Sequence, residues 1–381
     1  MFIYKRIISL LIFLIFLLIN GFLLFRAKNN NERKKILFLY SIVLAVLGFF
    51  YTPYITADLY RIFEQLQLYY EPLNFTQFLN WAKTNPIFFG MLYYYFFAKI
   101  KVYSLLPATT AFIFYNLIFS IFNKSTKKFD IKNFDVIMIF IFIMAGGQYV
   151  DVISGIRCML SMSIVAYCIY NEFFEDKKIF SNIFLYIIAS MIHPASLILV
   201  LIRFIYYIFQ GEGNRISKFV KFILSTIFCI CFVFLLKNNL IEAFKKADGY
   251  ASVNVYSYMW EYIIAIIAMM YMFFVLRCFK RIDRVSFNNN LKFINFFKVI
   301  YIITLFCFPI YSIFHRYRSF LSMIFIPILC MTYRKLEKDD NERYLKNFNT
   351  LSCVILIIQL LIVFVRGNLC GFNIFGILFL I

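Results

Sequence analysis

The chain has 381 residues, of which 63% are hydrophobic and 15% are charged. Soluble domains are typically about 45–50% apolar and about 25% charged, so a soluble enzyme, a disordered chain and a small secreted domain are excluded. In a soluble protein, the formal net charge of +20 would suggest a nucleic-acid partner. Here the basic residues lie between long apolar runs, so we expect them to orient helices in a bilayer and expect no nucleic acid.

The apolar runs are continuous, whereas the strands of a membrane barrel alternate apolar and polar residues. A bilayer core of about 30 Å requires about 20 helical residues. The sequence therefore predicts an all-α fold: a polytopic integral membrane helix bundle of about 11–13 transmembrane helices, in one domain of residues 1–381. The predicted spans are 7–25, 36–53, 102–122, 134–150, 152–170, 180–192, 194–209, 217–236, 256–278, 299–314, 316–333 and 347–365.

The orientation follows from the distribution of lysine and arginine, which accumulate on the cytoplasmic side. With the N-terminus outside, most of the 39 basic residues lie in predicted cytoplasmic segments. These segments are 26–35, 123–135, 171–178, 210–221, 277–298 and 334–346. Residues 54–101 then form an outer loop plus a re-entrant or interfacial segment at 86–101. A segment that crossed the membrane fully there would place the following lysine-rich loop on the outer side.

Neither a cofactor nor a metal site is expected. The nine cysteines contain no C-x-x-C pair, and the two histidines are too far from them in sequence to indicate a Cys/His metal set. No acidic metal triad, P-loop or dinucleotide fingerprint is present. The cysteines are therefore interpreted as small buried apolar side chains.

Four groups of ionisable residues lie in or beside apolar runs, where each charge costs about 2.5–3.5 kcal/mol on insertion scales. Residues of this kind are functional candidates by default, and the predicted topology places all four groups at the outer face. The groups are Asp58 with Arg61, Asp151 with Arg157, His193, and His315 with Arg316 and Arg318.

The arginines of these groups are candidate anion ligands. Arg157 stands among small residues that allow close helix packing, and a guanidinium there can bind phosphate bidentately. The alternative is an arginine that snorkels to the interface or pairs with Asp151. His315 and Arg318 are three residues apart and so share a helix face, which predicts a second anion-binding element together with Arg316.

His193 precedes Pro194, which lacks an N–H and disfavours helix at the preceding residue, so the chain is predicted to turn or kink there. A histidine at such a boundary can act as a base near neutral pH. The alternative is a structural, hydrogen-bonded histidine. Arg203 lies deeper, about ten residues further along, and either faces a cavity or snorkels to the cytoplasm.

The outer loop carries Asp58, Tyr60 and Arg61 among several other tyrosines and Trp81, a mixture that suits sugar rings. An aromatic belt at the lipid interface explains the tyrosines equally well. Two arginine elements and a histidine beside a membrane fit an anionic substrate held by the bilayer, such as a lipid-linked pyrophosphate.

These stretches resemble the EpsG-like proteins, the Wzy-type polysaccharide polymerases. The segment IRCMLSMSIVAY, followed by IHPASLILV, resembles their paired signature of an arginine-containing span and a histidine element. ADLYRIF, NPIFFGMLYYYF and HRYRSF resemble three further elements of the group. Cys158 stands where glutamine is usual and Asn85 where glutamate is usual.

The resemblance implies a metal-independent glycosyltransferase at the outer face of the bacterial cytoplasmic membrane. It transfers a growing glycan from polyprenyl pyrophosphate to a new lipid-linked repeat unit, for capsule, exopolysaccharide or O-antigen. A flippase and a chain-length regulator are expected partners, besides membrane lipids. Arg157, His193 and Asp58 are the expected catalytic residues. The expected pyrophosphate- or sugar-binding residues are Arg316, Arg318, His315, Arg61, Tyr60, Asp151 and Arg203.

Other functions remain open from the sequence. A lipid-linked oligosaccharide flippase or transporter would need a cationic cavity deep in the spans, where Arg203 is the only deep charge. A membrane glycan acyltransferase would place a histidine near the cytoplasmic donor side, whereas both histidines are predicted outside. A membrane protein without enzymatic activity is a further alternative.

Overall fold

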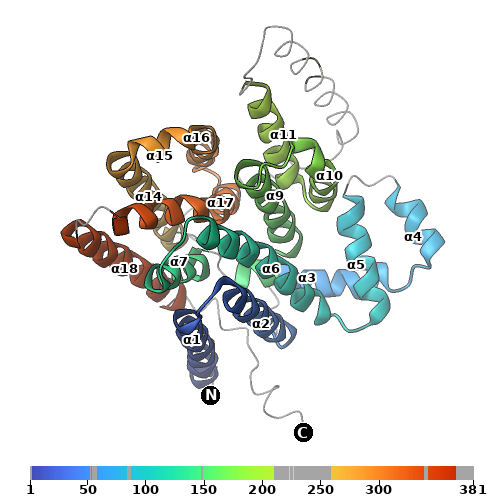
Figure 1. Ribbon diagram of the computed structural model, residues 1–381. Coiled ribbons are helices and arrows are strands. Elements are labelled where there is room, and N and C mark those ends of the chain that lie inside the picture. Colours follow the sequence, from blue (N-terminus) through green and yellow to red (C-terminus); the bar gives the residue numbers. More distant parts are fainter. Residues whose placement is uncertain are drawn as a thin grey trace.

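The computed structural model describes residues 2–51, 53, 58–83, 87–146, 149–209, 223, 226, 259–338 and 342–365. These segments are helical, and none of them forms a β-strand (Figure 1). The predicted span 217–236 and the apolar tail 370–381 lie outside the described residues. The α-helices are α1 Phe2–Arg26, α2 Asn30–Phe49, α3 Asp58–Gln65, α4 Phe75–Ala82, α5 Phe88–Ile100, α6 Leu105–Lys128, α7 Asn133–Gly146, α8 Tyr149–Ser154, α9 Ile156–Phe174, α10 Ile183–Ile192, α11 Pro194–Phe209, α14 Met259–Ile282, α15 Arg284–Asn289, α16 Leu291–Phe306, α17 Tyr311–Lys338 and α18 Glu342–Val365, with a π-helix η1 at Leu66–Tyr70 and a 3-10 turn η2 at Ile179–Asn182.

Helices α2 and α6 pack antiparallel and set the direction of the bundle. Gly48, near the end of α2, lies against the carbonyl of Pro107 at the start of α6. Midway along both helices, the Asn116 amide donates to the Ser41 hydroxyl over 2.9 Å. At the start of α2, Arg33 donates to the Asn133 side chain, which follows α6, over 2.6 Å.

One end of the bundle gathers the lysine-rich connections, here called the basic end (residues 26–33, 124–133, 171–178, 283–292 and 331–338). Lys124 donates to the Asn171 side chain over 3.2 Å, and Lys128 donates to the Phe174 carbonyl. Tyr206, near the end of α11, donates to the Lys292 carbonyl over 2.7 Å. Segments that the positive-inside rule assigns to one side of the membrane therefore lie together.

The segment between α2 and α6 begins and ends at the opposite end of the bundle, so it does not cross. Helix α5 has 13 residues and is about 20 Å long, too short for a bilayer core of about 30 Å. Its C-terminal end is held by Glu71, whose carboxylate accepts from Lys101 over 2.8 Å and from the Tyr103 hydroxyl. This arrangement fits the predicted outer loop with a re-entrant or interfacial segment at 86–101.

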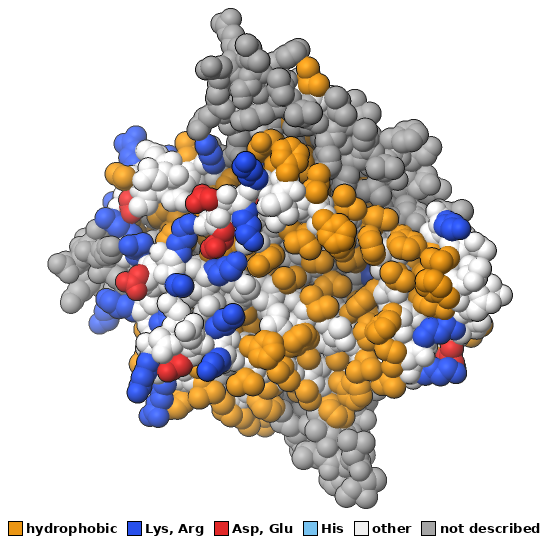
Figure 2. All heavy atoms as spheres, turned by 45° about the vertical axis from the view of Figure 1, so that its right-hand side comes forward, with side chains coloured by type: hydrophobic (Ala, Val, Ile, Leu, Met, Phe, Trp, Pro, Cys, Tyr) orange, Lys and Arg blue, Asp and Glu red, His pale blue; other side chains and the backbone are white. Residues whose placement is uncertain are grey.

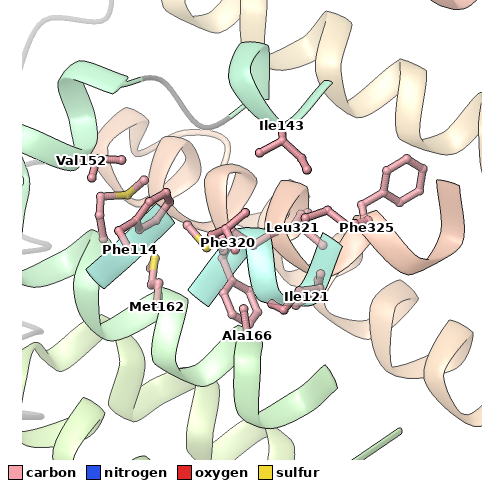
Figure 3. Close-up of a cluster of buried hydrophobic side chains, with 14 of the residues drawn as sticks. Phe114, Ile121, Ile143, Val152, Met162, Ala166, Phe320, Leu321 and Phe325 are labelled. Carbon is pink, nitrogen blue, oxygen red and sulfur yellow. The ribbon is translucent and has the colours of Figure 1, made fainter. Parts of the chain in front are cut away.

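The core lies between α6, α7, α8, α9 and α17. Apolar side chains from all five helices meet there (Figure 3): Phe114 and Ile121 from α6, Ile143 from α7, Val152 from α8, Met162 and Ala166 from α9, and Phe320, Leu321 and Phe325 from α17. Helix α17 is the central element, because 89% of its most apolar window is buried inside the protein.

The described helices fit a membrane protein. Leu105–Lys128, Tyr262–Ile282 and Tyr311–Leu336 are long and apolar enough to cross a bilayer, and five shorter apolar helices accompany them. Large apolar side chains such as Leu18, Phe184 and Met270 are exposed. Figure 2 shows apolar side chains spread broadly over one face, between a lysine- and arginine-rich margin and a smaller charged margin. Such a surface requires lipid as its solvent.

Several predicted boundaries differ from the observed ones, and two of them are wrong by the widest margin. The span predicted at 299–314 ends at Phe306, and a new helix begins at Tyr311, because Pro309 cannot continue the helical hydrogen bonding. The loop predicted at 277–298 instead holds the end of α14, all of α15 and the first half of α16. Burial of Phe287 and Phe293 stabilises helix there despite the surrounding lysines and arginines.

Candidate functional site

A break between two helices places Asp151 and Arg157 on either side of Gly155. Helix α8 ends at Ser154 and α9 begins at Ile156. The Gly155 N–H donates to the Asp151 carbonyl over 2.8 Å, and a Cβ at Gly155 would lie only 2.8 Å from that oxygen. Glycine is therefore required for the break, which lies at the end of the bundle opposite the basic end.

Asp151 is hydrogen-bonded to His315 from the other half of the chain. The His315 Nε2 lies 2.7 Å from the Asp151 Oδ2, and the two side chains are 14% and 31% exposed, respectively. On the other ring nitrogen, Tyr311 Oη and Arg318 Nη2 each lie 3.3 Å from His315 Nδ1. A guanidinium only donates, so Nδ1 accepts and Nε2–H donates to the carboxylate.

Arg318 is fully buried in the core beneath this pair. Its Nη1 donates to the Gly146 carbonyl over 3.2 Å, while Nη2 faces His315. The predicted common face of His315 and Arg318 is therefore observed. Burial also means that the guanidinium of Arg318 does not reach the surface of the bundle, and that it meets the partly exposed pair through His315.

Arg157 lies half-buried against an aromatic platform that α5 supplies. Its guanidinium carbon is 4.9 Å from the centre of the Tyr94 ring, within the range of a cation–π contact. Tyr94 is itself completely buried. Tyr94 also interacts with Arg157 by a side-chain hydrogen bond, so the platform holds the arginine in place. A guanidinium fixed in this way can bind a planar anion.

His193 forms the junction between α10 and α11. Its backbone is extended, with φ −151° and ψ 137°, as the following proline predicts. Its Nδ1 accepts from the Ala195 N–H over 3.1 Å and so caps the start of α11. The neutral ring therefore carries its proton on Nε2, which makes His193 a hydrogen-bond donor.

Gly90 of α5 brings Arg157 and His193 into one neighbourhood. A Cβ at Gly90 would lie 2.7 Å from the carbonyl oxygen of Ile192 and 3.0 Å from Cδ of Arg157. Ile192 is the residue before His193. Helix α5 therefore packs directly on both candidate elements, and only glycine allows this approach.

Cys158 shows that the two charged elements are neighbours. This buried residue lies within the electrostatic range of Arg316, Asp151 and Arg157. Arg316 is half-buried at the start of α17. Among the described residues, the cluster thus combines two arginines, one carboxylate and two histidines, all of them partly accessible.

The loop residues lie at the rim of this cluster. Asp58 and Arg61 form an ion pair within α3, with side chains 53% and 63% exposed, and Tyr60 between them is half-buried. Asp58 lies within electrostatic range of Tyr94, the platform of Arg157. Helix α3 therefore adjoins the cluster, with its charged side chains exposed.

Arg203 is not part of the cluster. It lies ten residues beyond His193 on α11, about 15 Å along the helix. Its Nε donates to Glu172 Oε2 over 2.8 Å, and the side chains are only 4% and 2% exposed. Tyr186 and Asn182 donate to the other carboxylate oxygen over 2.7 and 3.1 Å.

Sequence reasoning missed Glu172, Tyr94 and Gly90. Glu172 had a usable signal, because a charge as deep as Arg203 requires a partner within the bundle. Tyr94 and Gly90 had none, since an aromatic residue and a glycine in an apolar segment are common. Within the described segments, no three histidine, cysteine or acidic residues gather as metal ligands.

The fold and the site together define a class: an all-α membrane protein with a cluster of cationic and acid–base side chains at one end of the bundle. Residues 102–375, more than two thirds of the chain, match the EpsG family. The protein therefore belongs to the EpsG family and is a membrane protein of the polysaccharide-polymerase type. No curated protein and no solved structure matches the chain.

The match includes the positions of Asp151, Arg157, His193 and the 315–318 element. It begins after the outer loop, so Asp58, Tyr60 and Arg61 lie outside the matched residues.

Proposed function

We propose that this protein polymerises oligosaccharide repeat units linked to polyprenyl pyrophosphate, at the outer face of the bacterial cytoplasmic membrane. The bond between the anomeric carbon of the growing glycan and the pyrophosphate oxygen breaks. A hydroxyl of the new repeat unit forms the glycosidic bond and loses its proton, and polyprenyl pyrophosphate leaves. The observation that carries this proposal is the joint position of Arg157, Asp151 and His315 in a chain of this family.

Arg157 and Arg316 bind the pyrophosphate in this proposal. Both are half-buried and both lie near Cys158, so their charges act together on a leaving group that develops negative charge. Preorganised cations are most effective for such stabilisation where water is largely excluded. Arg318, being buried, contributes by fixing His315.

Asp151 receives the proton of the acceptor hydroxyl. It is the partly accessible carboxylate beside the two arginines, and His315 holds its orientation through Nε2–H. Of the two carboxylates near the cluster, Asp58 is the more exposed and is engaged with Arg61. We therefore assign the base to Asp151, and assign Asp58, Tyr60 and Arg61 to contacts with the sugars.

His193 orients the substrate. Because Nδ1 caps α11, the Nε2–H is the group that this ring presents as a donor to a sugar or phosphate oxygen. No metal is required for the reaction, since the arginines supply the positive charge.

The basic end faces the cytoplasm in this proposal, as the positive-inside rule requires. The cluster then faces outward, where a flippase delivers the repeat units and a chain-length regulator can reach the product. Ten residues along α11, from His193 to Arg203, and fifteen along α9, from Arg157 to Glu172, separate the cluster from the buried Arg203–Glu172 pair. That pair is therefore assigned to stability.

The test is reconstitution of the purified protein in nanodiscs with a synthetic polyprenyl-pyrophosphate repeat unit. A ladder of glycans is expected from the wild type without added metal, and none from Arg157→Ala. In vesicles, the labelled lipid-linked repeat unit is also expected to remain on the leaflet to which it was added. Transbilayer movement of the labelled lipid without a ladder would contradict the proposal and assign a transporter.

A further inference from the structure

Tyr70, the last residue of the π-helix η1, packs against the aromatic platform of Arg157. Its ring centre is 6.0 Å from that of Tyr94, and the two ring planes are at 85°, an edge-to-face arrangement. Tyr70 is 6% exposed, whereas Tyr69 beside it is 62% exposed. The π-helical turn therefore directs Tyr70 towards α5 and leaves its neighbour at the surface.

Tyr70 is itself held from two sides. On one side, its ring centre is 5.3 Å from that of Trp81 in α4, with the ring planes at 72°. On the other, the next residue, Glu71, is bound to the C-terminal end of α5. Its carboxylate accepts from Lys101 over 2.8 Å, and its carbonyl accepts from Lys99 over 2.8 Å. Helices α4 and α5 lie side by side at the edge of the bundle (Figure 1), and Tyr70 is fixed between them.

Tyr70 also lies within electrostatic range of Arg157 itself. Burial raises the pKa of Tyr70 to about 12, and the positive charge of Arg157 acts against that rise. Tyr94 contacts the same guanidinium through its ring face and by a side-chain hydrogen bond. Two tyrosines, one from η1 and one from α5, therefore lie beside one arginine.

This arrangement matters because an arginine side chain is long and loses conformational entropy when a ligand orders it. A guanidinium that is already held avoids part of that cost, and preorganised charge is the most effective in stabilising a leaving group. Tyr94 holds Arg157 more firmly when its own ring is fixed. Tyr70 packs at right angles to that ring and so restricts it from the side of the outer loop.

We propose that Tyr70 is a positioning residue of the pyrophosphate site: its ring fixes Tyr94 and, through Tyr94, the guanidinium of Arg157. This inference rests on the proposed function and extends it, because it makes the η1 turn of the outer loop a part of the leaving-group site. The family match begins at residue 102, so it assigns no role to this turn. Tyr70 acts through its neighbours and does not touch the reacting atoms.

The test measures the affinity of the purified full-length protein in detergent for farnesyl pyrophosphate, by isothermal titration calorimetry. Tyr70→Ala is expected to weaken binding about 3- to 10-fold, the effect of losing one aromatic contact. Tyr70→Phe keeps the ring and should bind as the wild type does. The matched control is Phe75→Ala, which removes an aromatic residue of the same loop that packs on Tyr95 of α5, and it should retain the affinity.

A double-mutant cycle with Arg157 separates positioning from a general structural role. In Arg157→Ala, the remaining Arg316 keeps binding measurable, and adding Tyr70→Ala should cause no further loss because the guanidinium that it positions is gone. A tyrosine that only stabilised the fold would weaken binding by the same factor in both backgrounds. If Tyr70→Ala does not fold, Tyr70→Leu, which fills much of the space without a ring, should show the same loss and the same dependence on Arg157.

Wild-type affinity in Tyr70→Ala, equal losses in Tyr70→Ala and Phe75→Ala, or an undiminished loss in the Arg157→Ala background would each overturn the inference. The two proposals fail in different ways, since binding is measured without elongation. A loss in Arg157→Ala but not in Tyr70→Ala would overturn only the role of Tyr70. Wild-type affinity in Arg157→Ala would contradict the proposed pyrophosphate site, and the role of Tyr70 with it.

Discussion

The carboxylate of Asp151 accepts a hydrogen bond from Nε2 of His315 over 2.7 Å, although 164 positions separate the two residues. This contact joins the short helix α8 to the central helix α17. Because Arg318 and Tyr311 approach Nδ1, the ring has one defined tautomer and a fixed orientation. A partly exposed carboxylate is thereby held in place beside Arg157 and Arg316.

Replacing Asp151 tests the assignment of the base. Asp151→Asn keeps the size of the side chain and can still bond His315, but it no longer accepts a proton. We expect the rate of glycan elongation to fall about 10²- to 10⁴-fold, the range for loss of a general base. Elongation is measured in nanodiscs with the thermal midpoint as the control for folding. An unchanged rate would contradict the assignment of Asp151 as the base and would favour Asp58 in that role.

Replacing Arg157 tests the pyrophosphate site. We expect Arg157→Ala to lower the elongation rate about 10²- to 10³-fold, as removal of one preorganised donor does. Arg157→Lys should recover only part of this loss, because a lysine lacks the planar fork and stacks less well on Tyr94. Lys280→Ala, an exposed cation three residues before the basic-end segment 283–292, should leave the rate unchanged. Equal rates for Arg157→Ala and the wild type would contradict the assignment of Arg157 to the pyrophosphate site.

Two glycine substitutions distinguish an effect of close packing at the site from a general effect of replacing a helical glycine. Gly90→Ala places a methyl group 2.7 Å from the Ile192 carbonyl and 3.0 Å from Arg157, so we expect α5 to shift and elongation to decrease. Gly21→Ala meets no atom within 4 Å and should leave elongation unchanged. It should also stabilise α1 by up to about 1 kcal/mol. Similar behaviour of the two variants would refute the argument.

The buried pair of Arg203 and Glu172 is predicted to support stability. Glu172→Gln leaves a buried guanidinium without a counter-charge, which costs about 3–5 kcal/mol in the free energy of unfolding. The double variant Arg203→Met/Glu172→Leu removes both charges and should recover most of that loss. Thermal midpoints of the purified variants measure this. A specific elongation rate that falls in the double variant without a stability loss would place Arg203 in the reaction instead.

The contact of Glu71 with Lys101 and Tyr103 predicts a pH dependence of the outer loop. Hydrogen bonds from Lys101 and Tyr103 lower the pKa of Glu71 below its ordinary value of 4.5. Its stabilising effect is therefore complete above about pH 4.5 and is lost as the pH falls through the lowered pKa of the folded state. Limited proteolysis between residues 71 and 101 should increase in that acidic range.

In Glu71→Gln, the same cleavage should already occur at neutral pH and lose this acid dependence. Glu64→Gln, a neighbouring exposed position, should keep the wild-type profile because Glu71 is intact. Acid-dependent cleavage that persists in Glu71→Gln would show that another group controls the loop.

By itself, the sequence determined the class of fold and predicted the sidedness of the chain. Long apolar runs can satisfy their backbone in lipid only as helices, and the lysine-rich connections mark one side. Local chemistry also determined the kink at His193 and the common face of His315 and Arg318, because both depend on residues within four positions of each other.

Only the tertiary structure decided which candidates act together. The pairing of Asp151 with His315, the burial of Arg318, the Tyr94 platform and the Arg203–Glu172 pair all join residues that are distant in sequence or depend on packing around them. Hydropathy is an average along one helix. The interaction partner of a charged side chain, and its burial, depend instead on which faces of the helices pack together. The sequence therefore placed Arg318 among the ligands at one face and left Arg203 either to face a cavity or to snorkel, whereas packing encloses each guanidinium within the bundle.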